Sequence, residues 1–213
     1  EFIFGDNIIY DLSLAPYCNL IIDFVSELSK TLQKNVNPKK FPDLIALAFW
    51  CRRQNLIKFC FNDNDKALGL VFHITPSNIP TNFAYSLLFG LLNGNSNIIK
   101  VSSKEFEQVE IFSKALKLLV KKKRFKIFEK MIKIVKYTNN EKFTEEISLK
   151  SDARLIWGSD QTIEKIKIFK TKLKTLDIVF PDRFSFSVFN INKISKLKPY
   201  DYNILIKNFY NDT

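Results

Sequence analysis

The chain has 213 residues, which is enough for one large domain or two small ones. Its composition, 46% hydrophobic and 14% aromatic, excludes a disordered chain and suffices for a dry core. The formal net charge of +11 favours an anionic partner, such as nucleic acid, a membrane surface or a polyphosphate ligand.

Residues 1–65 are predicted to form a helical segment. Apolar residues recur near the helical period in 19–32 and 41–61, and a turn signal follows at 62–65. From residue 66 onward, short apolar runs alternate with helical patterns. The strands predicted there are 67–74, 97–101, 132–137, 153–157, 177–180 and 186–190. The helices predicted between and after them are 81–93, 105–120, 140–149, 161–169 and 203–213.

Strands that alternate with helices of about ten to fifteen residues predict parallel pairing and a doubly wound sheet. The predicted strands are apolar throughout, as expected when helices cover both faces of a sheet. The fold class is therefore α/β, with a Rossmann-like parallel sheet preceded by N-terminal helices. We expect two parts, a helical segment at 1–65 and an α/β domain at 66–213.

The cysteines argue against a metal site. Cys18, Cys51 and Cys60 lack a CxxC or metal-ligand spacing, and His73 is the single histidine, so no zinc site is expected. The pattern fits reduced thiols of the cytoplasm. Apolar runs such as 83–92 are too short and interrupted to cross a bilayer, and no signal peptide is recognised. We expect a cytoplasmic protein without a membrane span.

The densest basic cluster, residues 121–126, follows an apolar helical run. It is interpreted as a solvated helix end, where cations also suit the helix dipole. Nucleic-acid binding driven by the positive charge is a weaker hypothesis. Because no zinc-finger spacing and no RNA-binding aromatic signature accompany the cluster, no nucleic-acid partner is predicted.

Ligands of open parallel sheets bind outside the carboxyl ends of the strands. Three segments follow predicted strands in this way, namely 75–80, 100–104 and 157–160. In the first segment, Pro76 and Pro80 stiffen the loop and hold Asn78 between them. A rigid loop that aims an amide donor suits an oxyanion site. An ordinary turn bond made by the asparagine is the alternative, and spacing alone favours it.

The other two segments carry groups suited to a phosphorylated ligand. Lys100 is followed by Ser102 and Ser103, and an ammonium with two hydroxyls could hold a ribose or its 2′-phosphate. The alternative is a solvated lysine beside a helix cap. Gly158 and Ser159 open a helix after a strand, so their amides could approach a phosphate, although a plain tight turn is the alternative. A GxGxxG fingerprint is absent, which argues against an ordinary Rossmann site.

Two further polar features are interpreted as structural. His73 stands at the end of a buried strand, where a lone histidine is more often a packed core residue than a base. Asp177, Asp182 and Arg183 are interpreted as a local ion pair around the loop 180–183.

Four ordered blocks of the sequence resemble a known family. The blocks at 69–86, 91–100, 152–160 and 177–185 closely resemble the LuxC-type acyl-CoA (fatty acid) reductases of luminous bacteria and their relatives. The resemblance covers about residues 40–213. This family belongs to the aldehyde dehydrogenase superfamily, so the resemblance implies an aldehyde dehydrogenase-type nucleotide-binding domain.

The resemblance also implies roles for residues at the three loops. Residues 76–80 are similar to the superfamily motif Pro-Trp-Asn-Phe-Pro, which makes Asn78 the oxyanion-hole amide. Lys100 matches the lysine that contacts the adenosine ribose or its phosphate, and Gly158-Ser159 matches the turn over the pyrophosphate. The cofactor-binding residues implied in this way are Thr75, Pro76, Ser77, Lys100, Ser102, Gly158 and Ser159.

The sequence departs from the family pattern in two ways. The region that holds the superfamily's catalytic glutamate reads 177–183 here and contains no glutamate, so no general base is carried across. The family's nucleophilic cysteine follows a segment like 209–213, where this sequence ends, and Cys18, Cys51 and Cys60 match no catalytic block. We therefore expect the catalytic cysteine domain to be absent from this chain.

The resemblance implies the N-terminal, cofactor-binding part of an NADPH-dependent fatty acyl-CoA or acyl-protein reductase. Such an enzyme makes a fatty aldehyde through a cysteine thioester, and by itself this part is expected to be inactive. The full-length protein is expected to form a homo-oligomer and to pair with an acyl-protein synthetase. The alternative is a truncated, non-catalytic interaction module for such a synthetase or for an oligomer partner.

Overall fold

The computed structural model describes residues 1–58, 65–138, 140–182 and 186–212. The chain divides into two compact units, Glu1–Asp182 and Arg183–Thr213. Within the described residues, no helix combines the length and the apolarity that crossing a membrane requires.

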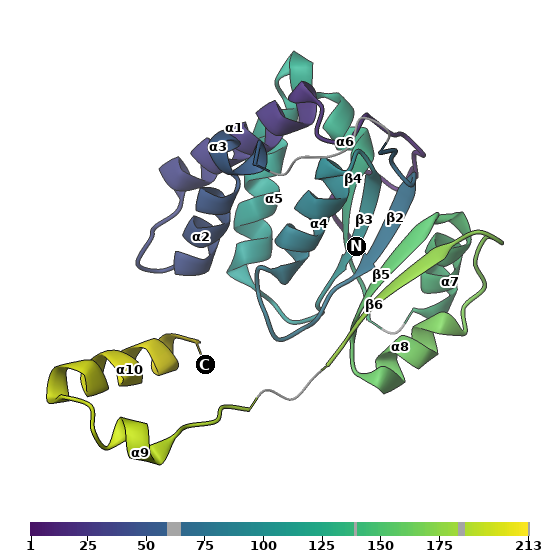
Figure 1. The fold of residues 1–213 in the computed structure, drawn as a ribbon. Helices are drawn as coiled ribbons and strands as arrows, with labels where there is room; N and C mark the ends of the chain where they lie inside the picture. Colours follow the sequence, from purple (N-terminus) through teal and green to yellow (C-terminus); the bar gives the residue numbers. More distant parts are fainter. Residues whose placement is uncertain (59–64, 139, 183–185, 213) are drawn as a thin grey trace. The chain divides into compact units, whose positions relative to one another are not determined.

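A six-stranded sheet forms the centre of the first unit, with strand order β1-β4-β3-β2-β5-β6 (Figure 1). The strands β2 to β6 pair in parallel, and β1 pairs antiparallel with β4. The predicted α/β class is therefore confirmed, as are the first five predicted strands to within a few residues at their ends. The strands are β1 (Phe2–Phe4), β2 (Leu70–Ile74), β3 (Ser96–Val101), β4 (Ile132–Lys136), β5 (Ala153–Gly158) and β6 (Leu176–Pro181).

The helices occupy the predicted connections. In the first unit they are α1 (Asn19–Asn35), α2 (Pro42–Trp50), α3 (Arg53–Leu56), α4 (Asn82–Leu92), α5 (Glu107–Val120), α6 (Ile127–Met131), α7 (Glu141–Lys150) and α8 (Asp160–Lys167), with a short 3-10 helix η1 (Lys123–Phe125). In the second unit they are α9 (Ile191–Ile194) and α10 (Pro199–Asp212).

Three predictions about these elements are wrong. The first residues are not helical, because Phe2 and Phe4 pair with β4 as an edge strand. The predicted helix at 41–61 is broken, because Arg52 is extended and the chain turns between α2 and α3. The predicted strand at 186–190 does not form. Among the described residues of its own unit there is no strand with which it could pair, and Phe186 is 87% exposed.

Helices cover both faces of the sheet. Because successive side chains of a strand point to opposite sides, neighbouring residues of one strand enter different cores. Ile99 belongs to a large core with α1, α2, α4, α5 and α6, in which Phe24 of α1 stacks on Phe128 of α6 at 4.0 Å between ring centroids. Ile98 belongs to a smaller core with α7 and α8. The helices α1 and α2 thus share a core with the sheet, while the proposed division at residue 65 stays a prediction.

Candidate functional site

The strand order reverses beside β2. From β2 the chain runs outward to β3 and β4, and it then returns to place β5 and β6 on the other side of β2. The loop after β2 leads to α4 on the face of the large core, whereas the loop after β5 leads to α8 on the opposite face. The two loops therefore diverge at the carboxyl edge, which is where open parallel sheets hold their ligands.

The strand register brings the three predicted segments to this edge. Ile74 pairs with Lys100 of β3 and with Ile156 of β5. The loop 75–80, the end of β3 and the turn Gly158-Ser159 consequently lie next to one another. All residues predicted to bind the cofactor, together with Asn78, therefore belong to one edge of the sheet.

The loop 75–80 is anchored at its start and open at its middle. The backbone N–H and the Oγ1 hydroxyl of Thr75 both donate to the Lys100 carbonyl, at 3.3 and 2.9 Å. Ser77 and Asn78 are exposed. Within the described part of the chain, the Asn78 side chain makes no hydrogen bond, so its amide is free to donate to a ligand.

Lys100 is a half-buried cation. Its ammonium lies 5.1 Å from the centroid of the Tyr137 ring, and burial lowers the pKa of Lys100. None of the described carboxylates forms an ion pair with Lys100. Tyr137 itself hydrogen-bonds Thr144 at 2.9 Å, and burial raises the pKa of the phenol to about 12. The Lys100 ammonium, held over the Tyr137 ring, is therefore a positive charge with no negatively charged partner among the described residues.

The aromatic partner of Lys100 was not predicted as a site residue. Tyr137 directly follows β4, so its position at a strand's carboxyl end was the available signal. Ser102, which was predicted, accepts a hydrogen bond from the Lys104 backbone N–H at 3.0 Å in the turn after β3.

The turn after β5 is shaped for close approach. Gly158 has φ of 150°, and a Cβ there would lie 3.1 Å from the Thr162 side chain. Ser159 caps α8, because its Oγ accepts a hydrogen bond from the Thr162 backbone N–H at 3.3 Å. The positive end of the α8 dipole therefore faces the edge, with Asp160 in its first turn.

An aromatic stack walls the same turn. The rings of Trp157 and Phe180 are parallel within 10° and lie 4.0 Å apart between centroids. The indole N–H of Trp157 is buried and has no hydrogen-bond partner among the described residues. A buried donor without an acceptor costs free energy, so it is a group that a polar ligand can satisfy.

His73 is confirmed as a core residue, with no exposed surface. Its Nε2 lies 2.9 Å from Asn97 Oδ1, and its Nδ1 lies 2.8 Å from Ser86 Oγ. Because the Asn97 oxygen can only accept, Nε2 carries the hydrogen and Nδ1 accepts from the serine. Burial lowers the pKa of His73 to about 4. Gly90 of α4 leaves the room this network occupies, since a Cβ there would collide with Asn97 Oδ1.

The predicted ion pair of Asp177 has a different partner. Both Asp177 carboxylate oxygens accept from Arg154, each at 2.7 Å, and the Arg154 side chain is 2% exposed. Register pairs the two residues across β5 and β6. Arg183 lies outside the described residues. The structural role predicted for Asp177 holds, but it acts between strands and not within the loop.

The described cysteines do not belong to the loops at the carboxyl edge. Cys51 is buried between α2 and α3, and burial raises its pKa. Cys18 precedes α1, and Cys60 lies outside the described residues. The Cys51 thiol is therefore neither exposed nor readily ionised.

Comparison with protein families matches residues 62–206 to the model "Acyl-CoA reductase (LuxC)". The chain belongs to the LuxC acyl-CoA reductase family. This match covers more than half of the sequence and confirms the resemblance drawn from the four blocks. No curated protein matches the chain in sequence.

Solved structures with a similar fold are aldehyde dehydrogenases. Lactaldehyde dehydrogenase from Escherichia coli aligns with a TM-score of 0.57 at 16% identity, over 77% of this chain and 40% of its own. NAD-dependent benzaldehyde dehydrogenase from Corynebacterium glutamicum aligns with a TM-score of 0.53 at 10% identity, over 79% of this chain and 42% of the dehydrogenase chain. Glyceraldehyde-3-phosphate dehydrogenase GapN from Methanocaldococcus jannaschii, complexed with NADP, aligns with a TM-score of 0.51 at 17% identity, over 76% of this chain and 40% of the GapN chain. This LuxC-family chain thus shares their fold and spans about two fifths of their length.

Proposed function

We propose that the carboxyl edge of the sheet binds NADPH, and that the chain is the cofactor-binding part of a reductase acting on fatty acyl-CoA or acyl-protein. The observation that carries this proposal is Lys100, a half-buried ammonium without a carboxylate partner among the described residues. Removing a charge from water is costly unless a counter-charge is present, so the position is suited to an anionic group.

The other groups at the edge fit the rest of a dinucleotide. Lys100, with Ser102, would hold the adenosine ribose or its 2′-phosphate. The turn at Gly158 and Ser159 offers backbone amides and a helix N-terminus to the pyrophosphate, and Trp157 has a spare indole N–H. Thr75, Pro76 and Ser77 would line the side towards α4. GapN from Methanocaldococcus jannaschii, which shares the fold, is complexed with NADP, and this supports the choice of cofactor.

NADPH would supply a hydride to the acyl carbon. Asn78 would donate its amide hydrogen bond to the oxyanion that develops on the acyl carbonyl, and losing such a donor typically lowers kcat by about 10²–10³-fold. A cysteine thiolate of the full-length enzyme, distinct from Cys18 and Cys51, would attack the acyl group and release the thiol of coenzyme A or of the carrier protein. Hydride addition to the resulting thioester would then release the aldehyde and regenerate the thiolate.

The test is a titration of the chain with NADPH in which calorimetry measures the binding. We expect Lys100→Ala to weaken binding by about tenfold or more, since a charge-assisted hydrogen bond contributes about 1.5–3 kcal/mol. Lys104→Ala is the matched control, because this exposed lysine lies on the same turn, and its binding should stay within about twofold of the wild type. Absence of NADPH binding by the wild-type chain, or equal losses in both variants, would reject the assignment.

A further inference from the structure

A groove of about 700 Å³ lies on the N-terminal helices, between α1, α3 and η1. We call it the α1–α3 groove. The helix α5 begins after the carboxyl end of β3, and η1 follows the far end of α5. The groove is therefore at the opposite end of the sheet from the candidate nucleotide site. Its charged lining residues are Asp23, Glu27, Lys30, Arg52, Arg53 and Arg124.

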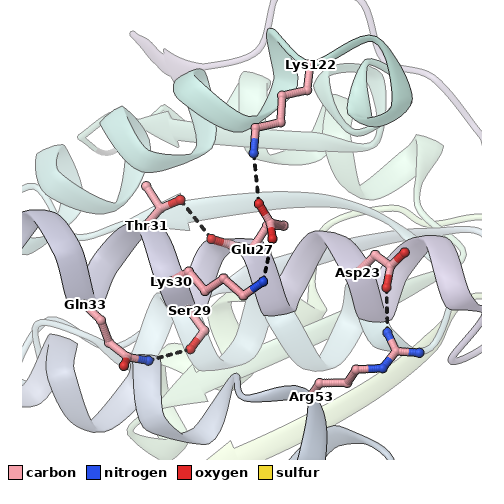
Figure 2. Close-up of polar contacts among 8 residues, drawn as sticks. All are labelled: Asp23, Glu27, Ser29, Lys30, Thr31, Gln33, Arg53 and Lys122. Carbon is pink, nitrogen blue, oxygen red and sulfur yellow. Dashed lines mark hydrogen bonds and ion pairs between the residues drawn. The ribbon is translucent and has the colours of Figure 1, made fainter.

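The two acidic residues of the groove are already neutralised. Glu27 accepts from Lys30 and from Lys122, each at 2.9 Å, and these ammonium groups hold its pKa at about 2. Asp23 pairs with Arg53 at 2.5 Å. Figure 2 shows Lys122 and Arg53 reaching α1 from opposite sides. The basic cluster at the end of α5 is thus more than a solvated helix end, since Lys122 pairs with Glu27 and Arg124 lines the groove.

Two arginines of the groove remain without a carboxylate. Throughout the described ranges, neither Arg52 nor Arg124 forms an ion pair. The guanidinium of Arg52 lies 4.3 Å from the centre of the Phe49 ring, and that of Arg124 lies 4.3 Å from the centre of the Phe125 ring. Such stacking orients a planar group that can bind a carboxylate through two hydrogen bonds. The groove therefore presents two partly fixed anion-binding groups.

The remaining lining suits a protein segment better than a small molecule. Small-molecule sites are concave and enclose most of their ligand, whereas this groove is largely open to solvent. In this groove, Gln33 and Ser29 form a polar chain at 2.8 Å, and Gln33 accepts from Arg52 at 3.4 Å. Ile57 is the apolar residue of the lining, and Phe49 lies under the Arg52 guanidinium; both side chains are more than half exposed. Exposed aromatic and arginine side chains with a polar surround are typical of protein interfaces.

We propose that the α1–α3 groove docks an acidic segment of a partner protein, with carboxylates on Arg52 and Arg124 and an apolar side chain on Phe49 and Ile57. Charge complementarity selects this occupant, since four basic residues line the groove against two acidic ones that are already paired. The proposal does not depend on nucleotide binding, because the two sites share no residue.

The test uses the whole chain and a fluorescein-labelled peptide of alternating glutamate and leucine. The fluorescence anisotropy of the peptide measures its binding to the chain. We expect Arg52→Ala/Arg124→Ala to weaken binding by at least about tenfold, because two charge-assisted contacts are lost. Lys165→Ala/Lys167→Ala removes the same charge from exposed positions on α8 and should change binding by less than about twofold. Affinity for NADPH should be the same in both variants and in the wild type.

Three results would overturn the proposal. The first is no binding of the peptide to the wild-type chain at about 0.15 M salt, where only short-range charge contacts persist. The second is an equal loss in the arginine and lysine variants, which would reduce the effect to net charge. The third is displacement of the peptide by inorganic pyrophosphate at or below the peptide's own concentration, which would assign the groove to a phosphate-bearing ligand.

Discussion

The strand β2 joins a core histidine whose ring nitrogens are both partnered to an edge where several polar groups are left open. Within the strand, both ring nitrogens of His73 are hydrogen-bonded inside the core. Just beyond it, Asn78 makes no side-chain bond and Lys100 has no counter-ion among the described residues. Around His73 the core thus follows the rule that buried polar groups are satisfied, and the edge beyond β2 departs from it.

This contrast separates polar groups that stabilise the fold from polar groups that are available to bind a ligand. A partnered group contributes to folding, so its removal should lower stability without a specific effect on ligands. An open group costs stability or contributes none, so its removal should affect binding alone. Each of the following measurements tests on which side of this division a residue falls.

The largest effect is expected at the ion pair between β5 and β6. Asp177→Asn leaves the Arg154 guanidinium buried without a carboxylate, which should lower the free energy of unfolding by about 3–5 kcal/mol. Urea denaturation would measure the loss. The control is Glu110→Gln, which breaks a pair whose two side chains are more than 70% exposed and should cost less than about 1 kcal/mol. Equal effects in the two variants would show that the buried pair is not structural.

Acid should destabilise the protein through His73. Its pKa in the folded state, about 4, lies below the ordinary value of 6.5, so the unfolded chain binds the proton more readily. The stability contribution is complete above pH 6.5, falls by up to about 3 kcal/mol as the pH drops to 4, and levels off below that. Denaturation curves of the wild type and of His73→Gln across this window would test the effect, and identical pH dependence would contradict it.

A smaller loss is expected at the partner of that histidine. Asn97→Ala leaves the Nε2 hydrogen of His73 unsatisfied in the core, which should cost about 1–3 kcal/mol. Asn93→Ala is the matched control, because Asn93 makes its hydrogen bond at the exposed end of α4. Thermal denaturation of the two variants should show the larger loss of stability for Asn97→Ala. A larger loss for Asn93→Ala would show that the hydrogen bonds of His73 contribute little to stability.

The smallest effect on stability is expected at the edge. Lys100→Met keeps the packed stem and removes a half-buried charge, so the free energy of unfolding should stay within about 0.5 kcal/mol of the wild type or rise. The same variant should lose affinity for NADPH. A clear loss of stability would move Lys100 to the structural side of the comparison.

Local signals predicted most of the α/β unit and failed where pairing is remote. The apolar runs of β2 to β6 and the prolines and glycine of the edge loops act within a few residues of one another, so the sequence reveals them. The edge strand at Phe2 and Phe4 depends on residues of β4 far along the chain, and no local pattern announces it. At 186–190 the apolar pattern is present, but the described residues of that unit include no strand that could pair with it.

The candidate site divides in the same way. Pro76, Pro80 and Gly158 could be singled out because their backbone restrictions are local. The position of Tyr137 under Lys100 requires β4 to lie beside β3. The bond from Arg154 to Asp177 likewise requires the register of β5 on β6. These contacts depend on the order and register of the strands, which cannot be predicted from local patterns in a single sequence.

The strand order also has a consequence for how the protein reaches its native state. The strands β2, β3 and β4 follow one another along the chain, so each of their pairings joins neighbours in sequence. In contrast, β5 must return past all of them to pair Ile156 with Ile74. Because distant contacts form slowly, we expect the carboxyl edge beside β2 to be completed late. Nucleotide binding would then serve as a reporter of completed folding, since a chain stalled before β5 docks would have a core but no site.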